Sequence, residues 1–551
     1  MTLEERVKIF VEEKGYTSDP HVLGIIFYGS SLTGYNRKNS DIDIQIIYDD
    51  SNPEHITRGN RTIYGKRIEY FERPLGDIYL TVDNAYINRD NSPVSIYGKG
   101  KVIYQRDNKI SDLRQYVLDV FSKPLPRLTD NEAKEQVSII NNRMEKLRKY
   151  ADTNDLYFEH LFHLTIEKIR RFYHDVMGLS MMEVTKAFRL YIDEGYRKSL
   201  CIDKIPEQEF LDMYFYAITE SDLSPREKYK LVSDIYDFSR RNIELGREYR
   251  IPIKSRSIVT NDNRKYPEVI RKNNNTFIPS DVLSKIKKFI DKMNYLNNPH
   301  CLGVIVCGSS ITGYSTKDSD IDLQVIFDDT IELIRGNSYI DGTRIEYFEK
   351  PITDIYNSID SEVLVQNNAL YSIIGKGIIV FEKRDDLSVL QTYANDVFSK
   401  PLPRLTDNEA KEQVSIINNR MEKLYELAIN SDPRFNHLYH LLIERIRKLY
   451  HRILGIPKVT TSKVYKIYTD EGYRNSTCKI NPEQEFIKMY TDLITNKSDN
   501  KMDKYQLLVN FYRYVTRGIN LGDDYCFTIK SRNTTDNTSH IQYVKSGCIN
   551  D

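Results

Sequence analysis

The sequence lacks long apolar runs. Apolar residues make up 40% of the 551 positions and charged residues 29%, and no segment approaches the roughly 20 consecutive apolar residues that span a bilayer. The first residues, MTLEERVKIFVEEKGY, alternate charges with the helix-spaced Leu3, Val7 and Phe10, unlike the apolar centre of a signal peptide. The sequence therefore predicts no membrane partner, and we expect a cytoplasmic protein.

Cysteine pairs and net charge are also lacking. The six cysteines form no CxxC pair, and a chain of this length can bury several cores without a disulfide framework. Lys plus Arg and Asp plus Glu both number 79, so no global charge favours nucleic acid. These features indicate a multidomain protein of a reducing compartment, and they leave room only for a local basic channel.

What the chain does have is a second copy of itself. Aligning the two halves pairs Asp41 with Asp320, and the block FSKPLPRLTDNEAKEQVSIINNRMEKL is identical at 121–147 and 398–424. Such a block indicates either recent duplication or a surface that both halves use. Because the period is far longer than that of solenoid repeats, each copy is expected to fold by itself.

Each copy changes character near its middle. Runs such as HVLGIIFYG, DIDIQIIY, KRIEYFE and GKVIYQ are typical of strands, whereas Thr129 and Glu132 form a capping box before apolar residues at helical spacing. The sequence predicts a mixed α/β module followed by an α-helical bundle, with this pair repeated twice in tandem. The predicted boundaries are 1–124 (α/β module) and 125–257 (helical) for the first copy, 258–279 (linker), 280–401 and 402–533 for the second copy, and 534–551 (tail).

A Gly-Ser turn precedes two alternating carboxylates in each copy. In the first copy Gly29 and Ser30 follow a strand-like run; a residue without Cβ lets backbone amides approach a phosphate, and the hydroxyl adds a hydrogen bond. Asp41 and Asp43 then share one face of a strand, because alternate residues point the same way. Adjacent carboxylates repel, and a divalent cation, Mg²⁺ or Mn²⁺, is the economical explanation.

A third carboxylate is expected from a neighbouring strand. Glu69 lies in the apolar segment RIEYF, where an unpaired charge would be costly; Asp77 and its counterpart Asp354 are the alternative. One Gly-Ser turn and one Asp-x-Asp pair are common in turns and strand edges, so their recurrence is what favours a functional site. The equivalent residues of the second copy are Gly308, Ser309, Asp320, Asp322 and Glu346.

Together these residues resemble the signature of the DNA polymerase β superfamily of nucleotidyltransferases. SDIDIQIIY followed by GKRIEYF is most similar to enzymes of the kanamycin nucleotidyltransferase kind, in which a helical domain follows. The motif match covers about 29–72 and 308–349. The resemblance implies a mixed-sheet nucleotidyltransferase fold in each copy.

The resemblance also implies an activity and its cofactors. Each copy would bind a nucleoside triphosphate, ATP being favoured, with Mg²⁺ or Mn²⁺, and transfer the nucleoside monophosphate to a hydroxyl, releasing pyrophosphate. Related enzymes often build sites between subunits, so we expect an intramolecular pseudo-dimer with two active sites. The triphosphate would be held by Gly29, Ser30, Gly308 and Ser309. The metal carboxylates would be Asp41, Asp43, Glu69, Asp320, Asp322 and Glu346.

A polar stripe follows one face of a predicted helix in each copy. EHLFHLTIEKIRRFYHDVMG and NHLYHLLIERIRKLYHRILG place histidines, a glutamate and an arginine at helical spacing. A solvated face would explain the stripe too, although such faces are usually Lys and Glu. By the resemblance, Glu167 and Glu444 would be general bases. The remaining stripe residues, expected at the acceptor site, are His160, His163, Arg170, His174, His437, His440, Arg447 and His451.

The acceptor stays open from the sequence. A small hydroxylated molecule such as an antibiotic is favoured, whereas toxin-like relatives modify tRNA or protein and others join nucleotides into oligomers; neutral charge disfavours a large RNA. From other classes, the helical half would be an RNase similar to HEPN domains, although Arg170 and His174 lie closer together than that motif requires. The last alternative is a non-catalytic nucleotide-binding module.

Overall fold

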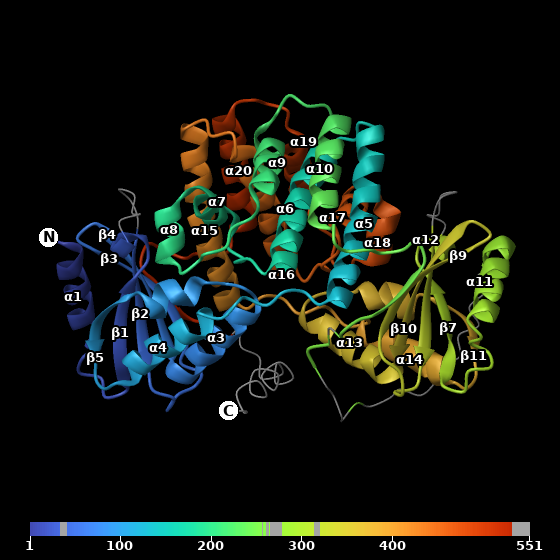
Figure 1. Ribbon diagram of the computed structural model, residues 1–551, viewed down its shortest axis with the longest axis horizontal. Coiled ribbons are helices and arrows are strands. Elements are labelled where there is room, and N and C mark those ends of the chain that lie inside the picture. Colours follow the sequence, from blue (N-terminus) through green and yellow to red (C-terminus); the bar gives the residue numbers. More distant parts are fainter. Residues whose placement is uncertain (34–40, 256, 260–263, 265–277, 313–319, 532–551) are drawn as a thin grey trace.

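Two sheet modules lie side by side beneath a shared layer of helices (Figure 1). The computed structural model describes residues 1–33, 41–255, 257–259, 264, 278–312 and 320–531. The predicted tail, 534–551, and most of the predicted linker, 258–279, lie outside the described residues. None of the helices in the described part of the chain combines the length and the hydropathy that a bilayer crossing requires.

The first sheet module is built from the apolar runs that the sequence predicts as strands. All seven residues of β1 are buried, because helices cover both faces of the sheet. Thr2 and Glu5 form a capping box that starts the first helix. The elements are α1 (Leu3–Glu13), β1 (Val22–Tyr28), α2 (Ser30–Thr33), β2 (Ile42–Tyr48), β3 (Thr57–Ile63), β4 (Lys66–Pro74), α3 (Leu75–Ile87), the π-helical turn η1 (Val94–Gly98), β5 (Lys101–Gln105) and α4 (Lys109–Phe121).

The second sheet module has the same elements in the same order. Its sheet likewise has a hydrophobic cluster on each face. The elements are α11 (Ser280–Lys292), β7 (Cys301–Cys307), α12 (Ser309–Thr312), β8 (Ile321–Phe327), β9 (Ile334–Ile340), β10 (Thr343–Pro351), α13 (Ile352–Leu364), η2 (Tyr371–Gly375), β11 (Ile378–Glu382) and α14 (Asp386–Val397). Both sheets are mixed, because β2 runs parallel to β4 and β8 to β10 while the other pairs are antiparallel.

The helices of both halves share one hydrophobic core. The capping box predicted at Thr129 and Glu132 is present and begins α5. The helices of the first half are α5 (Asp130–Asp152), α6 (Phe158–Met177), α7 (Val184–Ile192), α8 (Glu194–Ser199), α9 (Gln208–Thr219) and α10 (Pro225–Ser239). Those of the second half are α15 (Asp407–Ile429), α16 (Phe435–Leu454), α17 (Thr461–Thr469), α18 (Glu471–Thr477), α19 (Gln484–Thr495) and α20 (Lys501–Val515).

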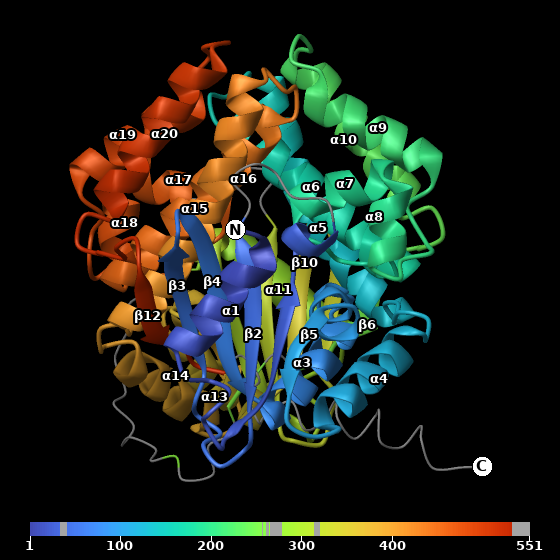
Figure 2. The same cartoon turned by 90° about the vertical axis from the view of Figure 1, so that its left-hand side faces the viewer.

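The two halves exchange their last strands. β6 (Tyr249–Pro252) leaves the helices of the first half and pairs with β9, whereas β12 (Tyr525–Thr528) leaves those of the second half and pairs with β3. The six-stranded sheets therefore have the orders β12-β3-β4-β2-β1-β5 and β11-β7-β8-β10-β9-β6. Figure 2 shows β12 beside β3 and β4. Each sheet is completed by a strand from the other half of the chain.

The helices cross over in the same sense. In Figure 1, α15 stands over the first sheet module and α5 over the second. Contacts agree: Arg67 of β4 meets Glu422 of α15, and Arg344 of β10 meets Glu145 of α5. Each sheet module therefore meets a helix of the opposite half.

Candidate active site

The Gly-Ser turns lie directly against the Asp-x-Asp strands. Gly29 has φ of 89° and Gly308 has φ of 81°, a left-handed conformation that glycine adopts without strain. A Cβ at Gly29 would lie 2.1 Å from Asp43 Oδ2, and one at Gly308 would lie 2.1 Å from Asp322 Oδ2. Glycine is required at both turns because backbone and carboxylate approach so closely.

The predicted carboxylates meet on adjacent parallel strands. Asp43 of β2 lies opposite Glu69 of β4, and Asp322 of β8 lies opposite Glu346 of β10. In the second module the ligand atoms of Asp320, Asp322 and Glu346 all lie within 4.8 Å of one another. The register places the third carboxylate where the sequence predicts it.

The alternative third ligands lie elsewhere. Asp77 is in the first turn of α3, beyond the carboxyl end of β4, and forms an ion pair with Arg73 at 2.5 Å. Asp354 begins the equivalent helix and accepts a hydrogen bond from Ser255. In the parallel register, the last residue of β2 lies opposite the last residue of β4. Asp77 follows the end of β4, whereas Asp41 and Asp43 lie at the start of β2, so Asp77 is at the opposite end of the strands. The register brings Glu69 and Glu346, and not Asp77 and Asp354, next to the aspartates.

Burial and, after it, mutual repulsion disfavour the charged form of one carboxyl in each site. Burial, followed by Glu69 and Asp41, raises the pKa of Asp43 to about 8. Burial, followed by Asp320 and Glu346, raises the pKa of Asp322 to about 7. Carboxylates in this arrangement favour a cation or a proton between them.

Arginines hold the outer carboxylates of each site. Arg67 Nη2 donates to Asp41 Oδ2 at 2.5 Å, and Arg344 Nη2 donates to Asp320 Oδ2 at the same distance. In each sheet a second arginine, on the strand next to the glutamate, forms an ion pair with it, Arg58 with Glu69 and Arg335 with Glu346. The ion pairs fix the carboxylates in place, and they make each site a compact arrangement of opposite charges.

A glutamate from the opposite half reaches each site. Arg344 contacts Glu145 of α5 at 3.2 Å as well as Asp320, and Arg67 contacts Glu422 of α15 at 3.2 Å as well as Asp41. Asn142 Nδ2 also donates to Glu346 Oε2 at 3.4 Å. Sequence reasoning missed both glutamates. The signal was present, because both lie in the block that is identical in the two copies.

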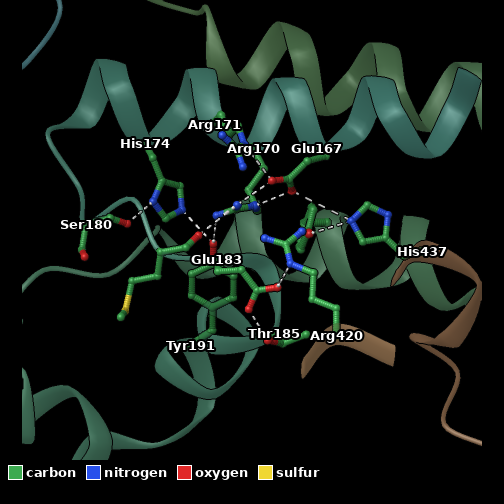
Figure 3. A network of polar contacts seen from close by, with 12 residues as sticks. Glu167, Arg170, Arg171, His174, Ser180, Glu183, Thr185, Tyr191, Arg420 and His437 are labelled. Carbon is green, nitrogen blue, oxygen red and sulfur yellow. Dashed lines mark hydrogen bonds and ion pairs between the residues drawn. The ribbon is translucent and has the colours of Figure 1, made fainter. Parts of the chain in front are cut away.

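The glutamates nominated as bases lie in the helical core instead. Glu167 accepts two hydrogen bonds from Arg170, each of 2.8 Å, and one from Arg171 (Figure 3). Glu444 is paired in the same way with Arg447. Burial opposes ionisation of Glu167, but the guanidinium groups of Arg170 and Arg171 outweigh it and lower the pKa of Glu167 to about 2. Both glutamates are committed to arginines, so the structure offers no support for a role as general base.

The histidine stripes face each other across the contact of α6 with α16. Nδ1 of His160 lies 3.1 Å from Nδ1 of His440, and Nδ1 of His163 lies 3.3 Å from Nδ1 of His437. The exposed fraction of these four side chains is at most 4%. An acceptor cannot reach these side chains, so the prediction of an acceptor site here is wrong. The stripe does occupy one helix face, but this face packs against the matching helix of the other half.

The last stripe residues are buried as well. His174 Nδ1 donates to the carbonyl of Ser180 at 2.8 Å, and Tyr191 donates to its Nε2 at 2.7 Å. His451 has the equivalent partners, Pro457 and Tyr468. Arg170 and Arg447 are 0% and 1% exposed. The stripe is therefore part of the core.

Comparison with known proteins identifies the class of the first sheet module. Residues 13–109, which hold the turn and the three carboxylates, match the family model described as Polymerase beta, Nucleotidyltransferase. This confirms the resemblance, and the first sheet module is a nucleotidyltransferase domain of the DNA polymerase β superfamily. No curated protein matches the sequence.

Among solved structures, a nucleotidyltransferase-like protein from Exiguobacterium sibiricum 255-15 is similar at 13% identity. The match covers 44% of this chain and 75% of that chain. Its TM-score is 0.27.

Proposed function

We propose that the chain is a tandemly duplicated, metal-dependent nucleotidyltransferase with two active sites. Each site would move a nucleoside monophosphate from a nucleoside triphosphate to a hydroxyl of an acceptor and release pyrophosphate. The observation that carries the proposal is the convergence of Asp320, Asp322 and Glu346 within 4.8 Å beside the Gly308 turn. The matched superfamily of the first module supports the same chemistry at Asp41, Asp43 and Glu69.

The carboxylates fit a divalent cation. All donors are carboxylate oxygens, which Mg²⁺ and Mn²⁺ prefer. Burial and, after it, the charges of Asp320 and Glu346 raise the pKa of Asp322, and a cation would relieve both costs. Asp320, Asp322 and Glu346 would hold it in one site, and Asp41, Asp43 and Glu69 in the other. When bound, such an ion would neutralise phosphate charge and acidify the acceptor hydroxyl.

Residues of the chain would do the rest. The turn at Gly308 presents its backbone amides to the triphosphate, because no Cβ shields them. Glu145 would take the proton of the acceptor hydroxyl on a carboxylate oxygen, since its side chain is 52% exposed and contacts Arg344, which also binds Asp320. Arg344 would orient this base. Glu422 and Arg67 would act equivalently at the first site.

The crossed contacts support an intramolecular pseudo-dimer. Each proposed site combines the carboxylates of one half with the helix of the other, α5 or α15, and each sheet takes a strand from the other half. Neither half alone would carry a complete site. A duplicated gene would thus replace the second subunit that related enzymes supply.

The RNase alternative has little support. An RNA would have to touch Arg170 and His174, which are 0% and 1% exposed. Both are already bonded to neighbours within the core.

Two single-site variants test the proposal. Asp41→Asn with Asp43→Asn would leave only the second site, and Asp320→Asn with Asp322→Asn only the first. With each labelled nucleoside triphosphate, Mg²⁺ and a cell extract as the source of acceptors, each double variant should retain transfer and the quadruple variant should release no pyrophosphate above background. Transfer by the quadruple variant would contradict the proposal, and so would the absence of Mg²⁺-dependent transfer by the unchanged chain.

A further inference from the structure

A cleft of about 390 Å³ opens beside the second site. Its walls are α5 and α10 of the first half, the segment leading into β6, and the edge of the second sheet at β9 and β10. Glu145 and Arg344, the proposed base and its arginine, both line it. The volume lies in the range of about 300–1,000 Å³ that is usual for small-molecule sites.

The cleft lies on the acceptor side of the carboxylates. The sheet order is β7-β8-β10-β9-β6 at this end, with the triphosphate turn after β7 and the carboxylates on and before β8 and on β10. The cleft is bordered by β10, β9 and β6, so it lies across the carboxylates from the turn. In-line transfer needs the acceptor opposite the leaving pyrophosphate, and this cleft is where the order of strands leaves room for it.

The lining of the cleft is basic and aromatic. Its charged residues are four arginines against two carboxylates, namely Arg148, Arg240, Arg247, Arg344, Glu145 and Asp237. Asp237 already accepts hydrogen bonds from Arg240 at 2.7 and 2.9 Å. The guanidinium of Arg247 lies 3.9 Å from the ring centre of Tyr339, and Tyr229, Tyr236 and Tyr249 complete the aromatic lining. Guanidinium groups recognise phosphate, and aromatic rings stack with bases.

The first site keeps the tyrosines of the lining, as Tyr505, Tyr512 and Tyr525, but lacks its excess of arginines. Asn337 donates to the carbonyl of Arg247 at 2.7 Å, and Asn60 donates to that of Asp523 at 2.9 Å, which establishes the correspondence. Arg148, Arg240, Arg247 and Tyr339 are replaced by Tyr425, Thr516, Asp523 and Thr62, while Asp237 is replaced by Arg513. At the positions equivalent to the cleft lining, the first site therefore has as many positive as negative charges. These are Arg67 and Arg513, Glu422 and Asp523.

We infer that the second site takes a phosphate-bearing nucleotide as its acceptor, either free or as the end of an RNA, and that the first site does not. The inference rests on the proposed function and adds the substrate class of one site. The hydroxyl of the acceptor would face Glu145, and its phosphate would lie on Arg240 and Arg247. A polycationic acceptor such as an aminoglycoside would meet like charge in this cleft.

Equilibrium binding tests the inference without relying on catalysis. Adenosine 5′-monophosphate, a short single-stranded RNA with a free 3′ hydroxyl, adenosine and kanamycin would each be titrated into the full chain. A non-hydrolysable triphosphate analogue and Mg²⁺ would first saturate the triphosphate sites. We expect a phosphorylated probe to bind at least about tenfold more tightly than adenosine or kanamycin, and Arg240→Gln with Arg247→Gln to weaken it about tenfold.

A matched control lies on α10, the helix that precedes Arg240 and lines the cleft. Arg226→Gln with Lys230→Gln removes the same charge from α10 outside the cleft and should leave binding unchanged. RNA binding much tighter than that of the mononucleotide would identify an RNA end, and equal binding would identify a free nucleotide. Absence of binding by both phosphorylated probes, equal binding of kanamycin, or no effect of the arginine variants would each overturn the inference.

Placing the arginines of the second site at the equivalent positions of the first site tests whether they determine the preference for phosphate. Thr516→Arg with Asp523→Arg should give the first site the same anionic preference and raise the stoichiometry of the phosphorylated probe from one to two. An unchanged stoichiometry would contradict the assignment to these arginines. Probes that bind through the arginines but are never modified would contradict the proposed function alone, whereas nucleotide transfer to kanamycin at the second site would contradict the inference alone.

Discussion

At the scale of residues, the partners of a carboxylate decide what it can do. Glu167 and Glu145 are both glutamates of the first half's helices, yet Glu167 is bonded to Arg170 and Arg171 and is 8% exposed. Glu145 has a side chain that is 52% exposed and one arginine contact, at the site itself. A base must be reachable and unsaturated, which selects Glu145.

The first prediction separates the two glutamates by activity. In a chain with Asp41→Asn and Asp43→Asn, Glu145→Gln should lower kcat of the remaining second site by about 10²–10⁴, as is usual for loss of a general base. Glu422→Gln is the matched control, because it belongs to the silenced first site. Steady-state kinetics of pyrophosphate release measure both. A loss of activity with Glu422→Gln but not with Glu145→Gln would show that each site uses its own half.

The second prediction concerns stability. Glu167→Gln leaves the buried Arg170 without its countercharge, so the free energy of unfolding should fall by about 3–5 kcal/mol while kcat of the folded protein stays unchanged. Urea unfolding and kinetics at low denaturant check the two parts. A loss of kcat with unchanged stability would restore Glu167 as a candidate base.

At the scale of elements, the sequence predicts helices and strands that have a local pattern, and it misses contacts between the two halves of the chain. The apolar strands, the capping box of α5 and the Gly-Ser to Asp spacing are local patterns, and the structure contains them. β3, with the sequence TRGNRTI, has no apolar alternation and was not predicted. β6 and β12 are four residues long, and their partners lie in the other half, so no local pattern reveals them. The sequence indicates that the histidine stripe is unusual, but it does not predict that the stripes of α6 and α16 pack against each other.

The exchanged strands give the third prediction. Ile251 of β6 and Phe527 of β12 are 3% and 6% exposed and occupy equivalent positions. Ile251→Asp should weaken the second sheet, because it buries a charge in the edge strand that closes it, and should reduce turnover at the second site. Phe527→Asp should affect the first site instead. Kinetics in the two single-site backgrounds measure this, and an effect on the site of the strand's own half would contradict the crossed arrangement.

At the scale of the whole molecule, four of the six buried stripe histidines lie at the contact between the two halves. Their burial is the largest cause of a lowered pKa at all six, and it brings the pKa of His174, His437 and His451 to about 3. The charged neighbours of the central four are Glu159, Glu167, Glu444, Arg170, Arg447, Lys228 and Lys504. The carboxylates favour the protonated histidines but do not overcome burial. All six histidines are therefore neutral in the folded protein near pH 7.

The last prediction is a loss of stability in mild acid. The folded pKa of each histidine lies below the unfolded value near 6.5, so the unfolded chain binds the additional protons, and stability is complete above pH 6.5 and falls as the pH drops toward the folded value. One histidine with a folded pKa near 3 contributes a loss of about 2 kcal/mol by pH 5. Glu159 and Glu167, whose pKa values are lowered to about 2, lose their contribution only below about pH 4.5.

Asp43, Asp322 and Glu362, whose pKa values burial raises to about 8, 7 and 7, take up protons in the folded protein between pH 7 and 5 and so oppose the decline. The measurement is therefore made in a chain with Asp43→Asn, Asp322→Asn and Glu362→Gln, which removes the opposing contribution. Urea unfolding of that chain from pH 7 to 5 should show the decline, and His163→Gln with His437→Gln should flatten it, whereas replacing the exposed His21 and His300 should not. A stability of that chain that is constant from pH 7 to 5 would mean that the α6 and α16 contact already opens to solvent at neutral pH.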